Sequence, residues 1–277
     1  MRTIPTAILA ATGLLMAMAS VQAQTPLADA HIHYSHDAWD ILPPAEAIKV
    51  LRKAGLRRAF VSSSSDRGTQ MLYRLAPDLI VPVLRPYRRR GELGTWFKDA
   101  SVGDMLAELP ARNTYAGIGE FHIFGKDADL AVPRRMVRLA ARYKKFLHAH
   151  ADPAVLDRIF AQDPEARVLW AHSGFDNPEG VAAMLSKHKN LWSDLAFRSE
   201  HATDGKVDPH WRKLFLAFPD RFMLGTDTFT PERWYHVIYQ ATWSRQWLTD
   251  LPLDVAENIA YRNAQTLARW ALGSRRR

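Results

Sequence analysis

The chain has 277 residues, of which 47% are hydrophobic, and this is enough to bury one large core. It has no cysteine, so disulfides and thiolate ligands are excluded, and any metal must be held by histidine, aspartate or glutamate. The net charge of +8 is most simply a property of the solvated surface and the C-terminal tail, and attraction of anionic partners is the alternative. No zinc-finger or RNP motif accompanies the charge, so nucleic acid is not an expected partner.

Residues 1–23 have the pattern of a secretory signal peptide. Arg2 supplies the basic start, residues 7–19 the apolar stretch, and residues 21–23 a small-residue cleavage site. The apolar run is short for a membrane span and has no basic flank after it. We therefore expect export to a periplasm or beyond, with residues 24–277 as a single mature domain that is not held in a membrane. A retained N-terminal anchor is the alternative.

Eight short apolar runs then alternate with longer amphipathic stretches. The predicted strands are Leu27–His33, Arg58–Ser62, Ile80–Arg85, Ala116–Phe121, Lys145–His150, Arg167–His172, Leu191–Leu195 and Phe222–Thr226. The predicted helices are Ala45–Ala54, Gln70–Leu75, Val102–Leu109, Pro133–Tyr143, Pro153–Ala161, Pro178–His188, Pro209–Phe218, Glu232–Leu248 and Asp254–Leu272. Several of these helices open with a capping side chain followed by proline, which suits the first helical position.

Eight strands that alternate with helices predict an α/β fold, a (β/α)8 TIM barrel. An open, doubly wound sheet is the alternative, but no glycine-rich dinucleotide motif follows the first strand. In a barrel of this kind the active site lies at the carboxyl ends of the strands. The predicted strand ends are therefore the place to look for chemistry.

Imidazole and carboxylate groups gather at those strand ends. His31 and His33 lie two residues apart on the first strand, so they point to the same side and can hold one divalent ion. Later strand ends carry Glu120, His148, His150, His172 and Asp227. Each of these residues alone has an ordinary structural explanation, such as a hydrogen bond at the rim or a helix cap. Their occurrence on five strands, all at the same end, favours a metal site.

These motifs resemble those of the amidohydrolase superfamily, specifically its amidohydrolase-related branch of metal-dependent barrel hydrolases. The resemblance covers residues 27–272 and rests on Asp29-Ala30-His31-Ile32-His33, Gly117-Ile118-Gly119-Glu120, His150-Ala151-Asp152, Trp170-Ala171-His172-Ser173-Gly174 and Gly225-Thr226-Asp227. The segment from Asn258 to Ala264 also resembles the closing helix of that branch.

The resemblance implies a role for each residue. His31 and His33 would bind the first metal, and Asp227 would also bind it and handle the proton of the attacking water. His172 would bind a second metal or polarise the substrate. His150 is preferred as the ligand from the fifth strand, because in this family that histidine is followed by Ala-Asp and a helix, as it is here. His148 is the alternative.

Glu120 is the residue that bears on the number of metals. In branches such as the TatD-like nucleases, a glutamate after the fourth strand bridges two ions, whereas other branches use a carboxylated lysine or a single ion. The expected cofactor is thus one or two divalent ions, with zinc as the first choice and manganese as an alternative that suits the same donors. Such an ion lowers the pKa of bound water from 15.7 to roughly 7 in favourable zinc sites.

The expected substrate is a small molecule, in which an ester, lactone or amide bond is cleaved. Arg85 ends the third predicted strand and could bind an anionic group of the substrate, with a salt bridge at the rim as the alternative. Arg198, after the seventh predicted strand, is a second candidate for the same role. Two alternatives use the same metal site: decarboxylation of an unsaturated acid, and phosphoester cleavage, including nuclease activity. A binding protein that has lost its metal ligands is a further alternative, but none of the ligands is lost here. The sequence leaves open whether the protein forms a homo-oligomer.

Overall fold

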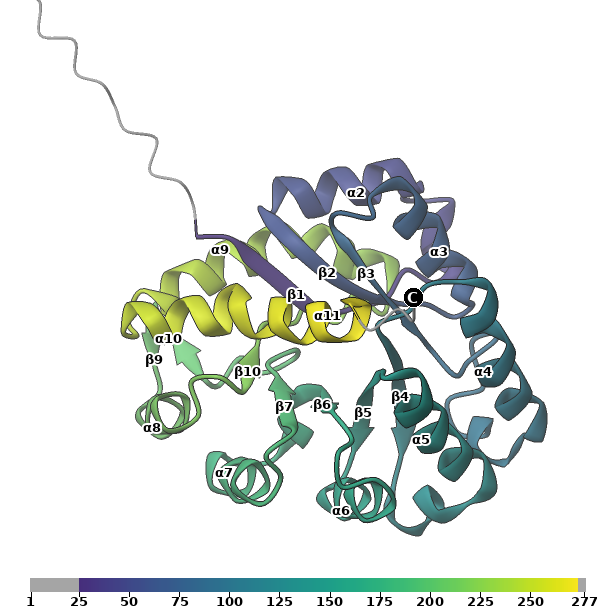
Figure 1. Cartoon of the computed structure of the whole chain (residues 1–277). Helices are drawn as coiled ribbons and strands as arrows, with labels where there is room; N and C mark the ends of the chain where they lie inside the picture. The colour runs from purple at the N-terminus through teal and green to yellow at the C-terminus, as the bar shows by residue number, and fades with distance from the viewer. Residues whose placement is uncertain (1–24, 274–277) are drawn as a thin grey trace, which may run out of the picture.

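The structure is a computed structural model that describes residues 25–273 (Figure 1). The predicted signal peptide lies outside the described residues. Among the helices of residues 25–273, none combines the length and apolar character needed to cross a lipid bilayer.

Eight parallel strands pair in chain order and form the sheet (Figure 1). They are β1 (Leu27–Ile32), β2 (Leu56–Ser62), β3 (Ile80–Leu84), β4 (Gly117–Ile123), β5 (Phe146–Ala151), β6 (Val168–Trp170), β7 (Leu191–Asp194) and β10 (Phe222–Met223). The sheet curls into a nearly closed barrel with helices between the strands, which confirms the predicted (β/α)8 TIM barrel.

The barrel closes between β1 and β10 through a few hydrogen bonds. The amide of Ala30 donates to the carbonyl of Leu224 at 2.8 Å, and the amide of Asp227 donates to the carbonyl of His31 at 2.7 Å. The first and last strands of the barrel therefore meet at a seam, and two of the candidate metal ligands lie on it.

Asp29 holds this seam from inside. Its buried carboxylate accepts hydrogen bonds from the amide of Thr226 at 3.1 Å and from the Thr226 hydroxyl at 2.7 Å. It also accepts one from the amide of His31 at 3.0 Å. Burial nevertheless raises the pKa of Asp29 to about 6, because these bonds offset only part of the cost of removing the charge from water.

The helices follow the predicted pattern with some differences at their ends, except that the one-turn helix His36–Trp39 has no predicted counterpart. They are α1 (His36–Trp39), α2 (Pro44–Lys53), α3 (Asp66–Leu75), α4 (Ala100–Arg112), α5 (Ala131–Tyr143), α6 (Pro153–Gln162), α7 (Pro178–Lys187), α8 (Pro209–Ala217), α9 (Val237–Leu248), α10 (Leu253–Glu257) and α11 (Asn263–Gly273). The capping side chains before proline are used as expected. Asp152, for example, accepts the amide of Val155 at 2.9 Å at the start of α6.

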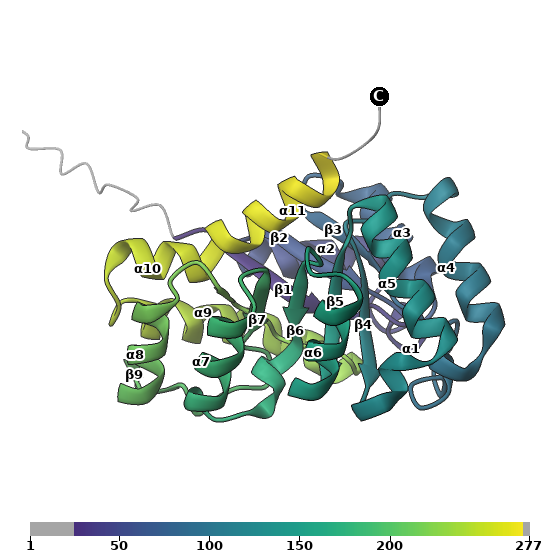
Figure 2. The same ribbon diagram turned by 60° about the horizontal axis from the view of Figure 1, so that its bottom comes forward.

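Helix α11 covers the amino-terminal end of the barrel, as Figure 2 shows. Its residues bind the starts of strands: Gln265 accepts a bond from Arg58 at 2.7 Å, and Asn263 donates to the carbonyl of Phe222 at 2.9 Å. Apolar side chains of α11 also share one buried cluster with Phe60 and Phe146. One end of the barrel is therefore closed, and the carboxyl ends of the strands remain available for a site.

Three elements differ from the prediction. The strand predicted to reach His172 ends at Trp170, and a 3-10 turn (Ala171–Phe175) follows it. The helix predicted over residues 232–248 starts as a 3-10 segment (Pro231–His236) before α9. The closing helix contains a π-helical turn (Asn258–Arg262) between α10 and α11.

A small hairpin after β7 was also absent from the prediction. It consists of β8 (Ala202–Thr203) and β9 (Lys206–Val207). Two-residue strands are too short to give a periodic signal in the sequence.

Candidate metal centre

The carboxyl ends of the strands bring the six predicted ligands into one cluster. They are His31, His33, Glu120, His150, His172 and Asp227. All are buried except His150, which is partly exposed. They lie in β1, β4 and β5, directly after β1, and in the segments after β6 and β10, so only the closed barrel can assemble them.

One half of the cluster contains His31, His33 and Asp227. The two Nε2 atoms of the histidines lie 3.2 Å apart. Oδ1 of Asp227 is 3.2 Å from Nε2 of His33 and 3.7 Å from Nε2 of His31. This oxygen is buried and makes no hydrogen bond of normal geometry with a described residue. A buried acceptor that faces two imidazole nitrogens is a donor set suited to one divalent cation.

Glu120 joins this half to a second one. Its Oε2 lies 3.2 Å from Nε2 of His33 and 3.5 Å from Nε2 of His31. Its Oε1 lies 3.0 Å from Nδ1 of His150 and 3.4 Å from Nε2 of His172. Each carboxylate oxygen therefore faces a different pair of imidazoles, which is the arrangement that a bridging ligand between two ions requires.

Asp194, at the end of β7, orients the cluster from behind. Its fully buried carboxylate lies 3.1 Å from Nδ1 of His31 and 2.9 Å from Nε2 of His148, and it accepts the amide of His172 at 2.9 Å. Burial alone would raise the pKa of Asp194, but the charge of His31 and the hydrogen bonds from both imidazoles hold it well below its usual range. A carboxylate at this position fixes Nδ1 of His31 as the donor and leaves Nε2 facing the cluster.

The other two Nε2 ligands are oriented by backbone carbonyls. Nδ1 of His33 lies 2.8 Å from the carbonyl of Ser62, and Nδ1 of His172 lies 3.0 Å from the carbonyl of Ala196. A carbonyl only accepts, so the neutral tautomer of each ring that fits this contact has its proton on Nδ1 and its lone pair on Nε2, towards the centre.

The fifth strand presents its two histidines differently. His150 turns Nδ1 towards Glu120, whereas His148 is engaged with Asp194 and lies behind the cluster. Of the two alternatives that the sequence leaves open, the geometry favours His150 as the ligand. Asp194 is a residue that the sequence analysis did not single out, although it lies next to the end of a predicted strand at the same rim, which was the available signal.

Negative charge is concentrated around His31. Burial by itself would lower the pKa of this imidazole, but the carboxylates of Asp194, Asp227 and Glu120 outweigh burial and raise the pKa well above its ordinary range. The same three charges favour any cation at this position. A divalent metal would compete there with the proton, so its binding should weaken as the pH falls.

A pocket of about 530 Å³ opens directly onto the cluster. Four of the candidate ligands line it: Glu120, His150, His172 and Asp227. The rest of its lining includes Arg85, Tyr87, Arg90, Leu93, His122 and Phe229. The guanidinium of Arg85 donates through Nη2 to Oε2 of Glu120 at 2.8 Å and through Nε to the carbonyl of Glu120 at 3.2 Å. Arg85 thus lies where the sequence predicts it, and it also holds Glu120.

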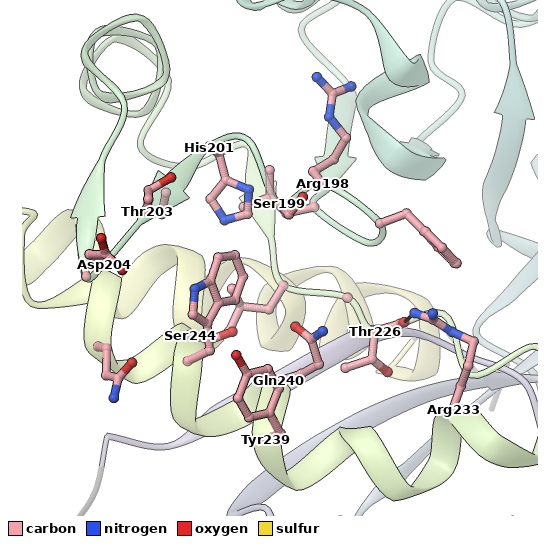
Figure 3. A pocket seen from close by; sticks show the side chains of 18 residues that line it. Arg198, Ser199, His201, Thr203, Asp204, Thr226, Arg233, Tyr239, Gln240 and Ser244 are labelled. Atoms are coloured by element: carbon pink, nitrogen blue, oxygen red, sulfur yellow. Dashed lines mark hydrogen bonds between the residues drawn. The ribbon is translucent and has the colours of Figure 1, made fainter.

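Arg198 does not line this pocket. Its guanidinium donates to the carbonyl of His172 at 3.0 Å and to that of Asp176 at 2.7 Å, and it lines a different cavity (Figure 3). The structure therefore does not bring Arg198 to the mouth where a substrate would meet the cluster.

The fold and this cluster together define a barrel enzyme with a histidine–carboxylate centre at its mouth. The sequence model of the amidohydrolase family matches residues 28–269, so the chain belongs to the amidohydrolase family. The protein is accordingly an enzyme, a metal-dependent hydrolase of the amidohydrolase type. A search of curated proteins finds none that matches the chain.

Solved structures share the fold at low sequence identity. A putative 2-pyrone-4,6-dicarboxylic acid hydrolase from Pseudomonas putida superposes with a TM-score of 0.63 at 14% identity, over 90% of this chain and 99% of that one. An uncharacterized TIM-barrel protein from Bordetella bronchiseptica gives 0.58 at 16% identity, over 82% and 83%. A TatD family hydrolase from Entamoeba histolytica gives 0.51 at 12% identity, over 87% and 98%. Such identities establish the barrel and leave the substrate open.

Proposed function

We propose that this enzyme uses two divalent ions, zinc in the first place, to hydrolyse an ester, lactone or amide bond in a small anionic molecule. The observation that carries the proposal is Glu120, whose two carboxylate oxygens face two separate pairs of imidazoles. Manganese suits the same nitrogen and oxygen donors and is the alternative metal.

The residues present fit two ions. His31, His33 and Asp227 would hold one ion, His150 and His172 would hold the other, and Glu120 would contact both. When bound, a divalent cation supplies a water of lowered pKa and polarises the bond to be cleaved.

Asp227 is the proposed catalytic base. Its pKa is held low, so the carboxylate is ionised at neutral pH, and Oδ2 can accept a proton while Oδ1 faces the ion site. Burial would raise that pKa, but the charge of His31 and the contact with His33 together outweigh burial. After taking the proton of the attacking water, Asp227 would return it to the leaving group.

His172 supports the same step from the other side. Its Nε2 lies 3.9 Å from Oδ2 of Asp227, while its Nδ1 faces the carbonyl of Ala196. Through Nε2 it would hold an ion next to the base; with its lone pair used in this way it would not also polarise the substrate carbonyl, because a carbonyl oxygen needs a donor.

The anionic character of the substrate is inferred from the mouth pocket. Arg85, Arg89 and Arg90 line it, while Leu93 and Phe229 provide apolar surface. Guanidinium groups bind carboxylates and phosphates in pairs of hydrogen bonds, so a substrate with an anionic group on a compact apolar frame suits this pocket. The likeness to a dicarboxylic acid hydrolase fold is consistent with this class.

The test is metal analysis followed by a substrate panel. The purified protein is stripped with a chelator and reloaded with zinc or manganese. It is then assayed on carboxylated lactones, esters, dipeptides and phosphoesters, with carbon dioxide release measured in parallel. We expect two ions per chain and hydrolysis of at least one carbon–oxygen or carbon–nitrogen substrate. Turnover of phosphoesters alone would show that the enzyme is a phosphoesterase, and carbon dioxide release without hydrolysis would show that it is a decarboxylase; either result would refute the proposed reaction.

The variant His31→Ala/His33→Ala is the control for this assay. It removes both Nε2 ligands of the first ion, so metal content should fall and turnover should disappear while circular dichroism still reports a folded barrel. Unchanged metal content in this variant would refute the proposed centre.

We also propose that the enzyme is exported to a periplasm or secreted. The support is the signal-peptide pattern of residues 1–23. Expression in a bacterial host, followed by fractionation and N-terminal sequencing, should give a periplasmic chain that begins near Gln24. A cytoplasmic chain with an intact N-terminus would contradict this.

A further inference from the structure

Arg198 binds the turn that carries His172. Its Nη1 donates to the carbonyl of His172 at 3.0 Å, and its Nη2 donates to the carbonyl of Asp176 at 2.7 Å. Its Nε contacts the carboxylate of Glu200, and the guanidinium lies 4.9 Å from the centre of the Trp211 ring. The Arg198 side chain is buried, and its Nε, Nη1 and Nη2 atoms all bond to other residues of the protein.

Arg233 binds the turn that carries Asp227 in the same way. Its Nε donates to the carbonyl of Asp227, and its Nη2 donates to the carbonyl of Thr226 at 2.6 Å. The guanidinium stacks on the ring of Phe197 at 4.0 Å and lies 5.5 Å from the centre of the Phe229 ring. A half-buried cation is thus fixed between two carbonyl oxygens and two aromatic faces.

Both turns have a backbone that needs external support. His172 and Ser173 adopt φ values of 57° and 50°, and Asp227 adopts 49°. A residue with a Cβ in this left-handed region costs of order 1–3 kcal/mol and persists only where the surroundings hold it. The carbonyls of His172 and Asp227 themselves are bound by the two arginines, so each guanidinium acts on a strained residue that also bears a candidate metal ligand.

A cavity of about 630 Å³ gives access to both arginines from outside the candidate metal centre. Figure 3 shows Arg198 across this cavity from Gln240 and Ser244 of α9, with Arg233 further along the α9 side. None of the six candidate ligands lines this cavity. A small solute can therefore reach the arginines without passing through the mouth pocket.

We propose that Arg198 and Arg233 are paired positioning residues, which hold the His172 and Asp227 turns so that Nε2 of His172 and the Asp227 carboxylate face the metal centre. This inference rests on the proposed function, because it assumes that the two side chains bind metal. Neither arginine lines the pocket in which the substrate would lie. Their effect would thus be exerted through the backbone.

The test uses Arg198→Lys and Arg233→Lys. Lysine keeps the positive charge, but its single ammonium group cannot reproduce two parallel bonds to two carbonyls. Apo-protein is titrated with Co²⁺, whose absorption spectrum reports both affinity and ligand geometry without any assay of activity. We expect Co²⁺ affinity to fall by roughly 10–100-fold in each variant, as is typical when a partner that orients a ligand is lost. In the zinc-loaded variants we expect kcat to fall more than KM changes.

Arg245 offers the matched control. It also donates to backbone carbonyls, those of Thr25 at 3.3 Å and Ala54 at 3.1 Å. It is not a candidate ligand, and it lines neither the mouth pocket nor the cavity next to Arg198 and Arg233. Arg245→Lys should bind Co²⁺ with unchanged affinity and spectrum. This comparison separates the general effect of losing arginine–carbonyl bonds from the specific effect of losing those made by Arg198 and Arg233.

Chemical rescue gives a second readout. In Arg233→Ala, guanidinium at tens of millimolar should enter from the cavity and restore part of the Co²⁺ affinity, while the same concentration of sodium should not. A wild-type chain that binds no Co²⁺ would refute the proposed function itself. A wild-type chain that binds Co²⁺, with lysine variants that bind it equally well and with the same spectrum, would overturn the positioning role. Failure of guanidinium to rescue Arg233→Ala would overturn it for Arg233.

Discussion

Oδ2 of Asp194 lies 3.1 Å from Nδ1 of His31, and this contact decides which nitrogen of His31 faces the metal centre. The two residues are 163 positions apart in the chain and meet only because β1 and β7 belong to one barrel. Asp194 does not line the mouth pocket, yet it determines which nitrogen of His31 faces the candidate metal centre.

Asp194→Asn tests this relationship. Oδ2 of Asp194 faces the imidazoles of His31 and His148, and its Oδ1 accepts the amides of His172 and Ala196. Asparagine must turn its NH2 group towards one of these two pairs and lose those bonds, so metal affinity should fall by roughly 10–100-fold. The measurement is a competition titration with a zinc chelator. Asp157→Asn is the matched control, because Asp157 also accepts from an imidazole, that of His188 at 2.8 Å, but at the protein surface. Equal affinities in the two variants would refute the role of Asp194.

Glu120→Gln tests the number of ions. Glutamine has one carbonyl oxygen in place of two carboxylate oxygens, so it cannot face both imidazole pairs and adds no negative charge. We expect the metal content, measured by mass spectrometry after dialysis, to fall from two ions per chain to one. A variant that retains two ions would show that the carboxylate is not the bridge. A wild-type content of one ion would refute the two-ion proposal directly.

His201 makes stability depend on pH. The ring is buried among Trp211, Trp243 and Trp247, and burial, helped by the charge of Arg198, lowers its pKa to about 3. Between pH 3 and pH 6.5 the unfolded chain binds this proton and the folded chain does not. The contribution of the neutral His201 ring to the free energy of unfolding is therefore complete above pH 6.5 and is lost as the pH falls from 6.5 towards 3.

The test compares the wild type with His201→Phe in urea at pH 7 and pH 5. The free energy of unfolding of the wild type should fall by about 2 kcal/mol more than that of the variant between these two values. Phenylalanine fills the same aromatic site and does not titrate, so the difference isolates the imidazole. Parallel pH dependence of the two proteins would contradict the prediction.

Thr226→Val tests the seam of the barrel. It removes the hydroxyl that donates to the buried carboxylate of Asp29 at 2.7 Å, and an unpaired buried acceptor costs about 1–3 kcal/mol of unfolding free energy. Below pH 6 Asp29 becomes protonated, so the loss should shrink there. Thr242→Val is the control, because the exposed Thr242 hydroxyl donates to the carbonyl of Ile238 within α9 and its loss should change stability by less than about 0.5 kcal/mol. Equal losses in both variants would contradict the role of the seam.

The sequence predicted the barrel because each strand is a local apolar run and each helix begins with a local capping signal. The cluster could also be predicted, since His31, His33 and Asp227 end such strands, and a barrel gathers its strand ends at one rim. Both inferences use short-range patterns together with one general rule of topology.

The rest depends on contacts between distant segments. The strand predicted to reach His172 ends early, because the amide of His172 is bound by Asp194 and the backbone turns into the left-handed region. Arg198 follows a strand like a substrate-binding residue, but its partners are carbonyls that the sequence does not place near it. In both cases the deciding neighbour lies about twenty residues or more along the chain, beyond any local pattern.

The hydrogen bond from the amide of Asp227 to the carbonyl of His31 joins the first strand of the barrel to its last. Because both residues also offer metal-binding atoms, closure of the barrel brings ligands of the first ion together. A nascent polypeptide that has not yet reached Asp227 lacks one of them, so the complete ligand set should form only after the last strand has been synthesised and has joined the first.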